Sequence, residues 1–457
     1  MDPAAGPDLR SGRLPAAQYA LRFADATGPL SAAQALVAAE RCLGCFDAPC
    51  VRACPTAIDV PAFIRRIAEG NVRGAARAIL EPNPLGGTCA RACPTEILCE
   101  RACVLAPEPG GPVDIGRLQR FAVDAALARP GPPLFVRASA TGRRIAVVGT
   151  GPAGLSCAHA LARRGHDVVM HDARPKAGGL NEYGLAAYKV AGDHAAHELA
   201  WILSIGGVAV RAGSAIDLGR ELDALARDHD AVFLATGLPA ARRLGIPGEE
   251  LPGVLDAVQF IAQLRQCEDL SRFPIGRRVV VIGGGMTAID AAVQSHLLGA
   301  EEVRIVYRRS LDAMPASGAE RDRALRHGVL LHQGLAPEAI LGSDLRGAGG
   351  YATAVRFARQ RFDDSGRVPT GEYETFAADL VLKAIGQVPA QAALAASGLR
   401  LADGGRIVVD EQMRTSRPGV WAGGDCRAGS DELTVSAVAD GQRAARSIHA
   451  ALAGARP

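Results

Sequence analysis

Apolar residues recur at helical spacing along three segments in the first third of the chain. The segments cover residues 30–43, 59–80 and 115–127, and cysteine-rich loops separate them. Because such spacing is typical of helices that bury one face, we expect a small helical domain here. Residues 128–142 follow without periodicity and are rich in Pro and Gly, which indicates a linker. The first thirty or so residues are expected to form a loose arm.

The remainder of the chain has the pattern of a nucleotide-binding α/β protein. The same structural unit occurs twice, at residues 143–172 and 277–309. In each, an apolar strand leads through a Gly-rich turn into a helix and a second strand. Three further apolar runs end in small residues and predict additional strands, at 231–239, 379–389 and 419–426.

Composition excludes several classes of function. The chain of 457 residues is 48% hydrophobic, yet we find no uninterrupted apolar run of about 18 residues that could span a bilayer. The N-terminus lacks the apolar core of a secretory signal, so a cytoplasmic location is expected. The net charge is +3 with basic and acidic residues interleaved, and aromatic residues make up 4%, which does not indicate nucleic-acid binding.

Cysteine placement points to metal. Eight of the 11 cysteines fall between Cys42 and Cys103. Since a cytosolic chain keeps its thiols reduced, this cluster favours metal binding over disulfides. The eight form two runs at short spacing, as iron–sulfur clusters require, and two runs predict two clusters. Structural zinc is the alternative, but zinc prefers paired CxxC knuckles and only Cys42 and Cys45 form one.

The first Gly-rich turn has the features of a dinucleotide site. Gly149 allows the tight turn, Gly151 lets the backbone approach a pyrophosphate, and Gly154 lets the helix pack on the strand. Asp172 ends the next strand, where a carboxylate binds a ribose hydroxyl.

The second turn repeats this geometry with Gly283, Gly285 and Ala288, but the strand after it ends in Arg308 and Arg309 instead of an acid. Basic groups there suit a phosphate on the adenosine ribose, whereas solvated arginines are the alternative. Two different dinucleotides are therefore predicted, a flavin and a nicotinamide cofactor, which together form a hydride relay. Further candidate cofactor-binding residues lie in these turns and in the later strand ends: Gly179, Leu180, Gly237, Met286, Thr287, Gly386, Gly424, Asp425 and Thr434.

These elements predict an α/β fold with an N-terminal helical iron–sulfur domain followed by two Rossmann-like nucleotide-binding domains, the second inserted into the first. The expected bounds are 1–135 for the helical domain, 136–262 and 380–457 for the two parts of the FAD-binding domain, and 263–379 for the NAD(P)H-binding domain.

The ATG turn, the inserted domain and the string WAGGDCRAG resemble the two-dinucleotide flavoproteins that include thioredoxin, adrenodoxin and glutamate synthase reductases. Neither nucleotide domain contains a CxxC, which argues against a thioredoxin reductase. From about residue 30 onward the chain resembles the NAD(P)H-oxidising subunits of bacterial dihydropyrimidine dehydrogenases, a group within the glutamate synthase small subunit-like flavoproteins. The strings CLGCFDAPCVRACPT, NPLGGTCARACPTEILCERACVL and GPVDIGRLQRFA carry this resemblance. The glutamate synthase pattern instead has a shorter CPAPCE segment and a Glu in place of Gln119.

The resemblance implies specific ligands. The first [4Fe-4S] cluster is expected to use Cys42, Cys45, Cys50 and Cys103, and the second to use Cys54, Cys93, Cys99 and the Gln119 amide. Cys89 is left without a metal role. Asp425 is expected to reach the ribityl or pyrophosphate part of the flavin.

The resemblance also implies the function. NADH or NADPH is expected to reduce FAD, and electrons then pass through the two clusters to a separate FMN- and iron–sulfur-containing subunit that interconverts uracil or thymine and the 5,6-dihydropyrimidine. The glutamate synthase small subunit, or another flavin-linked reductase subunit, is the alternative enzyme. A non-catalytic iron–sulfur redox sensor is the alternative of another class.

Overall fold

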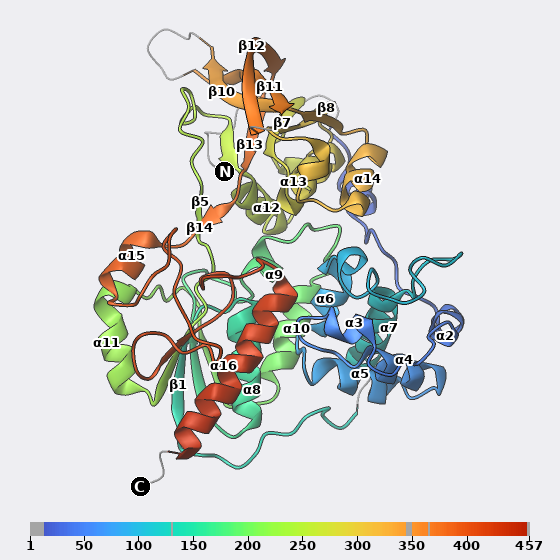
Figure 1. The fold of residues 1–457 in the computed structure, drawn as a ribbon, viewed down its shortest axis with the longest axis vertical. Helices are drawn as coiled ribbons and strands as arrows, with labels where there is room; N and C mark the ends of the chain where they lie inside the picture. Colours follow the sequence, from blue (N-terminus) through green and yellow to red (C-terminus); the bar gives the residue numbers. More distant parts are fainter. Residues whose placement is uncertain (1–12, 129–130, 344–349, 364–365, 455–457) are drawn as a thin grey trace. The chain divides into compact units, whose positions relative to one another are not determined.

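The protein folds as two compact units (Figure 1). The structure, a computed structural model, describes residues 13–128, 131–343, 350–363 and 366–454. Unit 1 takes in residues 1–26, 183–191 and 241–387, and unit 2 takes in residues 27–182, 192–240 and 388–457. The short strands β5 (Ala240–Ala241) and β14 (Gln387–Val388) pair with each other where the chain passes between the units.

The N-terminal part of unit 2 is helical, as the apolar spacing predicts. The expected helix over residues 59–80 is two helices, because Gly70 takes a left-handed φ of 75° and the Asn71 side chain caps a new helix by accepting from the Gly74 N–H. The main helices here are α2 (Ala32–Glu40), α4 (Val60–Ala68), α5 (Val72–Leu80) and α7 (Ile115–Ala128).

The cysteine-rich segments are more helical than the sequence analysis expects. Two short helices lie within them, α3 (Pro49–Arg52) and α6 (Gly86–Ala92), together with the 3₁₀ turn η1 (Thr95–Ile97). The description of these segments as loops is therefore wrong at α3 and α6. Helix α6 begins with two glycines, which lowers its intrinsic helix propensity and hides it from a pattern-based prediction.

A five-stranded parallel sheet forms the rest of unit 2, in the order β15-β4-β1-β2-β3. Helix α16 packs along α8, and the two lie side by side in Figure 1. A Cβ at Gly441 of α16 would come within 2.3 Å of the Ala153 carbonyl oxygen, so the close approach of the helices requires glycine there. The elements are β1 (Arg144–Val148), α8 (Pro152–Arg163), β2 (Asp167–His171), α9 (Leu180–Tyr183), α10 (His194–Leu203), β3 (Val208–Arg211), α11 (Leu218–Asp228), β4 (Ala231–Leu234), α15 (Gln391–Ala396), β15 (Val420–Ala422) and α16 (Thr434–Gly454).

Unit 1 contains a second five-stranded parallel sheet, in the order β6-β13-β7-β8-β9, and an antiparallel sheet β10-β11-β12. The elements are β6 (Val254–Asp256), α12 (Ala257–Arg265), η2 (Leu270–Arg272), β7 (Arg278–Gly283), α13 (Met286–Leu297), β8 (Glu302–Tyr307), η3 (Leu311–Ala313), α14 (Gly318–Arg326), β9 (Leu330–Gln333), β10 (Leu335–Gly342), β11 (Ala352–Asp363), β12 (Gly366–Ala377) and β13 (Leu380–Ala384).

The expected loose arm is wrong for the residues around α1 (Ala16–Arg22). Tyr19 is 2% exposed, belongs to the core of unit 1, and donates a hydrogen bond from its hydroxyl to the Leu298 carbonyl oxygen at 3.0 Å. This helix therefore belongs to the folded part of unit 1. Residues 1–12 lie outside the described residues.

The α/β class and the repeated strand–turn–helix–strand unit are confirmed, as β1-α8-β2 in unit 2 and β7-α13-β8 in unit 1. The four domain bounds remain a prediction. Among the described residues no helix is both long and apolar enough to cross a bilayer.

Candidate functional site

The first Gly-rich turn connects β1 to α8, and its glycines divide into two kinds. Gly149 has φ 103°, and a Cβ there would lie 2.2 Å from the Ala235 carbonyl oxygen. A Cβ at Gly154 would lie 2.0 Å from the carbonyl oxygen of Gly149. At Gly151 the nearest atom would be 3.9 Å away. The outer two glycines are thus needed by the fold, whereas a Cβ at Gly151 would make only an ordinary van der Waals contact, so this glycine is the one that lets a pyrophosphate approach the backbone.

Asp172 lies beside this turn, at the end of β2. Its Oδ2 accepts hydrogen bonds from the Thr150 N–H at 2.9 Å and from the Thr150 hydroxyl, and its Oδ1 accepts from the Arg174 N–H at 2.9 Å. Thr150 is not among the residues predicted from the sequence. Its fully buried side chain also accepts from the Gly178 N–H at 3.2 Å, so it joins the turn, the carboxylate and the next loop.

Other predicted flavin-binding residues meet at the same end of this sheet. Gly179, which precedes Leu180 of α9, is so close to Gly151 that a Cβ on it would lie 2.6 Å from the Gly151 Cα. Thr434 at the start of α16 donates to the Asn181 Oδ1 at 3.4 Å. Gly237 follows β4 with φ 60° and borders open space.

Gly424 and Asp425 follow β15. The Gly424 N–H donates to the buried Asp440 carboxylate at 3.0 Å, and Arg427 also pairs with Asp440. Asp440 is not among the residues predicted from the sequence, since an acid within a helix usually lies in solvent. Burial raises the pKa of Asp425 to about 6, although the Ser430 hydroxyl donates to its Oδ1 at 3.2 Å and opposes this effect.

This raised pKa gives a pH-dependent prediction for the flavin-free protein. Burial disfavours the charged carboxylate, so the contribution of Asp425 to stability is complete below its unfolded pKa near 3.9 and is lost as the pH rises through about 6. Asp425→Asn should therefore raise the free energy of unfolding relative to the wild type by at most about 3 kcal/mol at pH 8, with a smaller gain at pH 5. Denaturant unfolding at both pH values measures the difference, and a difference that does not change with pH would contradict the prediction.

In the second Gly-rich turn, in unit 1, the glycines again divide into those that the fold requires and one whose Cβ position is free. Gly283 has φ 150°, and its Cβ would lie 2.2 Å from the Ala384 carbonyl oxygen, while a Cβ at Gly284 would lie 2.5 Å from the Tyr307 ring. Gly285 has no atom within 4 Å of its Cβ position. Helix α13 begins directly after it with Met286 and Thr287, and Ala288 is fully buried in the core. Gly386, with φ 100°, lies in the turn between β13 and β14.

Arg308 and Arg309 follow β8, the second strand of this unit. Both are exposed. Neither guanidinium makes an ion pair or hydrogen bond with another of the described residues. They are therefore available to a phosphate on the ribose of a dinucleotide bound at the turn.

Four cysteines line one pocket in the helical part of unit 2: Cys42, Cys45, Cys50 and Cys103. Apolar side chains such as Val60 and Ile64 make up much of the remaining wall. Burial and the neighbouring thiols raise the pKa of Cys50 to about 11. Among the described residues, no group of three or more His, Cys, Asp or Glu side chains is arranged to hold a metal ion. The four thiols nevertheless line one pocket, and thiolates are the donors that iron–sulfur clusters use, so the residue types suit a cluster.

In the second predicted ligand set, the three thiols lie near enough to influence one another, and the set as a whole remains a prediction. The pKa of Cys99 is raised by burial and by neighbouring groups that include Cys54, and that of Cys93 by burial and by Cys89, Cys99 and Cys54. Cys89 is buried close to this set, although the resemblance gives it no metal role. Gln119 is 8% exposed, and its Nε2 donates to the Gly86 carbonyl oxygen at 2.7 Å.

Two family models match the chain. The model of the pyridine nucleotide-disulphide oxidoreductases matches residues 143–441, and that of dihydropyrimidine dehydrogenase domain II, 4Fe-4S cluster, matches residues 20–130. Together they cover both dinucleotide turns and both cysteine sets.

Curated relatives of similar length also match. The glutamate synthase [NADPH] small chain of Escherichia coli is 34% identical over 94% of this chain and 93% of its own length. The NAD-dependent dihydropyrimidine dehydrogenase subunit PreT of Escherichia coli is 35% identical over 92% of this chain and 95% of its own length. Among solved structures, thioredoxin reductase of T. acidophilum matches with a TM-score of 0.52 and 25% identity over 68% of this chain and 99% of that protein.

Proposed function

This chain belongs to the pyridine nucleotide-disulphide oxidoreductase family, and we propose that it is the electron-transfer subunit of a dihydropyrimidine dehydrogenase. More broadly, it is an oxidoreductase subunit with an FAD- and NAD(P)-binding part and a 4Fe-4S domain. The finer proposal adds two clusters, an FMN partner subunit and a pyrimidine as the final substrate. The observation that carries the electron-transfer part is the pocket of four thiols within the same compact unit as the first dinucleotide turn. The pyrimidine part is supported by the match of residues 20–130 to dihydropyrimidine dehydrogenase domain II and by the similarity to the PreT subunit.

In the proposal, separate groups of residues bind the flavin, the nicotinamide dinucleotide and the iron–sulfur clusters. FAD, when bound, supplies the conversion of a transferred hydride into single electrons for the clusters. In the proposal Gly151 and the N-terminus of α8 receive its pyrophosphate, and Asp172 binds its ribose. Gly285 and the N-terminus of α13 receive the nicotinamide dinucleotide, with Arg308 and Arg309 beside its ribose. Cys42, Cys45, Cys50 and Cys103 would hold the first cluster in a mainly apolar pocket, a setting that influences its potential, and Cys54, Cys93, Cys99 and Gln119 would hold the second.

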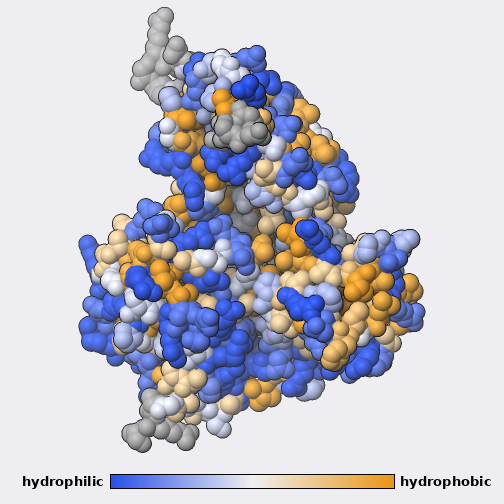
Figure 2. Space-filling view, viewed as in Figure 1, coloured by the Kyte–Doolittle hydropathy of each residue, from blue (hydrophilic) through white to orange (hydrophobic). Residues whose placement is uncertain are grey.

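An exposed apolar surface supports the proposal of a partner subunit. Leu43 and Val104 line the four-thiol pocket and are 66% and 44% exposed, and Phe46 is fully exposed. Figure 2 shows apolar residues gathered over this cysteine-bearing part of the surface. Exposed apolar groups of this kind mark protein contacts. A partner that docks there would receive electrons next to the first cluster.

The proposal is tested by anaerobic oxidation of NADH and NADPH with this chain and its FMN partner, with uracil added or withheld. Uracil should accelerate the oxidation and be converted to 5,6-dihydrouracil with one NAD(P)H and one proton consumed per uracil. If uracil has no effect, the pyrimidine assignment is wrong. A chain that holds clusters but whose flavin is not reduced by either nicotinamide would instead be a redox sensor.

The same assay tests the nicotinamide preference. Arg308→Ala combined with Arg309→Ala should lower the ratio of kcat/KM for NADPH to that for NADH by about tenfold or more, because hydrogen bonds to charged groups contribute about 1.5–3 kcal/mol each. An unchanged ratio would show that these side chains do not bind a 2′-phosphate.

A glutamate synthase small subunit is the second candidate, because the relative of that name is as similar as the dihydropyrimidine dehydrogenase subunit. Turnover that depends on glutamine and 2-oxoglutarate, with a glutamate synthase large subunit in place of the FMN partner, would favour it.

A further inference from the structure

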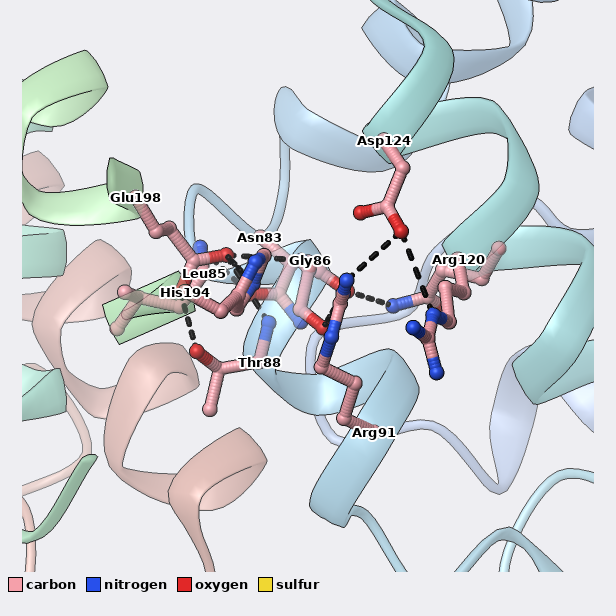
Figure 3. Close-up of polar contacts among 11 residues, drawn as sticks. Asn83, Leu85, Gly86, Thr88, Arg91, Arg120, Asp124, His194 and Glu198 are labelled. Carbon is pink, nitrogen blue, oxygen red and sulfur yellow. Dashed lines mark hydrogen bonds and ion pairs between the residues drawn. The ribbon is translucent and has the colours of Figure 1, made fainter. Parts of the chain in front are cut away.

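The buried carboxylate of Glu198 on helix α10 is hydrogen-bonded to helix α6, which contains Cys89 (Figure 3). Glu198 is 1% exposed. Its Oε1 accepts from the N–H groups of Gly87 at 2.8 Å and Thr88 at 3.0 Å, and its Oε2 accepts from the Thr88 hydroxyl at 2.5 Å. All three donors belong to the first turn of α6. A carboxylate is rarely buried this completely unless hydrogen bonds replace its contacts with water. These three hydrogen bonds hold the first turn of α6 in place.

The same turn also fixes Gln119. The Nε2 of Gln119 donates to the carbonyl oxygen of Gly86, the residue before the two that Glu198 binds. Because a carbonyl oxygen can only accept, this bond sets the orientation of the amide and leaves its oxygen as the end for another partner. At the other end of α6, the Cys93 N–H donates to the Cys89 carbonyl oxygen at 2.9 Å. Helix α6 therefore contacts one proposed ligand of the second cluster at its start and leads into another at its end.

Helices α10 and α6 pack tightly against each other at Gly87. A Cβ at Gly87 would lie 2.7 Å from the Nε2 of His194 and 2.9 Å from the Oε1 of Glu198. The His194 Nε2 is 3.9 Å from that Oε1, and burial lowers the pKa of His194 to about 4, so its ring is neutral near pH 7. A shift of the Glu198 side chain would therefore move the start of α6 directly.

We propose that Glu198 is a positioning residue for the second cysteine set. By holding the N–H groups of Gly87 and Thr88, it fixes the Gly86 carbonyl that orients the Gln119 amide, and so sets the reduction potential of the cluster bound by that set. The inference rests on the proposed function, in which Gln119, Cys54, Cys93 and Cys99 are the ligands. Partners that orient metal ligands from outside commonly tune the metal in this way.

The test is an EPR-monitored redox titration of the holoenzyme, with iron content measured in parallel. Glu198→Ala removes all three acceptor contacts, so it should shift the potential and change the EPR signal of the second cluster while the first cluster is unaffected. Glu198→Gln keeps an oxygen for the two N–H groups and an amide for the Thr88 hydroxyl, so it should restore both readouts to near the wild-type values. Burial raises the pKa of Glu198 to about 7, which makes the neutral amide a close substitute near neutral pH.

A matched control exists in unit 1. Glu249 is 6% exposed and accepts from the consecutive N–H groups of Leu244 and Gly245 at 2.8 Å each. Glu249→Ala should leave both cluster potentials unchanged. A Cys45→Ala chain, which should lack the first cluster, assigns the two signals.

The potentials measured for these variants support or contradict the positioning role of Glu198. Wild-type potentials for both clusters in Glu198→Ala, or an equal shift in the Glu249 control, would overturn it. If Glu198→Ala does not fold, Thr88→Ala must still shift the second cluster in the same way, because it removes one of the three contacts. A wild-type protein with no second cluster would overturn the inference together with the two-cluster proposal, whereas a wild-type protein with two clusters and an unchanged Glu198→Ala would overturn the inference alone.

Discussion

A Cys45→Ser chain should oxidise NAD(P)H at the wild-type rate of flavin reduction and yet deliver electrons to its partner only at the background rate. Cys45 shares one pocket with three other cysteines, so its loss removes one of four thiolates. The dinucleotide turns lie elsewhere in the chain and keep their geometry. Stopped-flow absorbance measures flavin reduction, and turnover with the partner measures delivery. Iron content should fall by about half if the chain holds two clusters of equal size.

Cys267→Ser is the matched control. Cys267 is partly buried in unit 1, outside both cysteine sets, where its Sγ donates to the Asp269 carbonyl oxygen at 3.3 Å. This variant should retain full iron and full transfer to the partner. If Cys45→Ser also retained full iron, the four-thiol pocket would not be a cluster site.

Gly285→Ala should weaken nicotinamide binding by tenfold or more without destabilising the protein, whereas the nearby Gly283→Ala should destabilise it. A Cβ at Gly285 enters open space, so only a ligand that approaches the turn meets it. One at Gly283 lies 2.2 Å from a backbone oxygen at a φ of 150°, which costs about 2–4 kcal/mol in strain and overpacking. Loss of affinity by Gly285→Ala of tenfold or more corresponds to about 1.4 kcal/mol.

The equivalent pair in unit 2, Gly151→Ala and Gly149→Ala, should behave in the same way toward the flavin. Denaturant unfolding measures the stability of each variant, and flavin absorbance and nicotinamide titration measure the binding. Gly285→Ala with wild-type affinity for both nicotinamides would contradict the placement of the dinucleotide at this turn. Equal destabilisation by Gly285→Ala and Gly283→Ala would contradict the division of roles.

The dinucleotide turns could be predicted from the sequence because their signals are local. A strand, closely spaced glycines and a helix follow one another within about thirty residues, and each glycine has its own steric reason. The confirmed β-α-β repeats show that these local signals were sufficient. The roles of Thr150 and Asp440 were missed, because each depends on a partner that only the folded chain brings near.

In the N-terminal helical part of unit 2, local sequence patterns do not predict every helix, because some contacts come from distant residues. Helix α6 begins with two glycines, and its first turn is stabilised by Glu198, more than a hundred residues away in the sequence. A polar residue on an amphipathic helix predicts a solvent-facing side chain, so the burial of Glu198 could not be predicted from the local pattern. The packing of Tyr19 in unit 1 likewise depends on residues nearly 280 positions away.

Function is less determined than fold for a physical reason. In the proposal, the residues that would bind the flavin, the nicotinamide and the clusters serve electron transfer to any acceptor, so they are compatible with either relative. The identity of the final substrate then depends on the partner subunit, which is proposed to dock near the first cysteine pocket.

The most direct test of the account is anaerobic titration of the purified chain with NADH and with NADPH, followed by absorbance and EPR, without any partner. If electrons pass from the flavin to the clusters as proposed, one nicotinamide should reduce the flavin, and electrons should then appear in two distinct iron–sulfur signals. Flavin reduction that leaves the iron–sulfur signals oxidised when their potentials permit reduction, or iron–sulfur centres reduced only by an artificial donor, would contradict it.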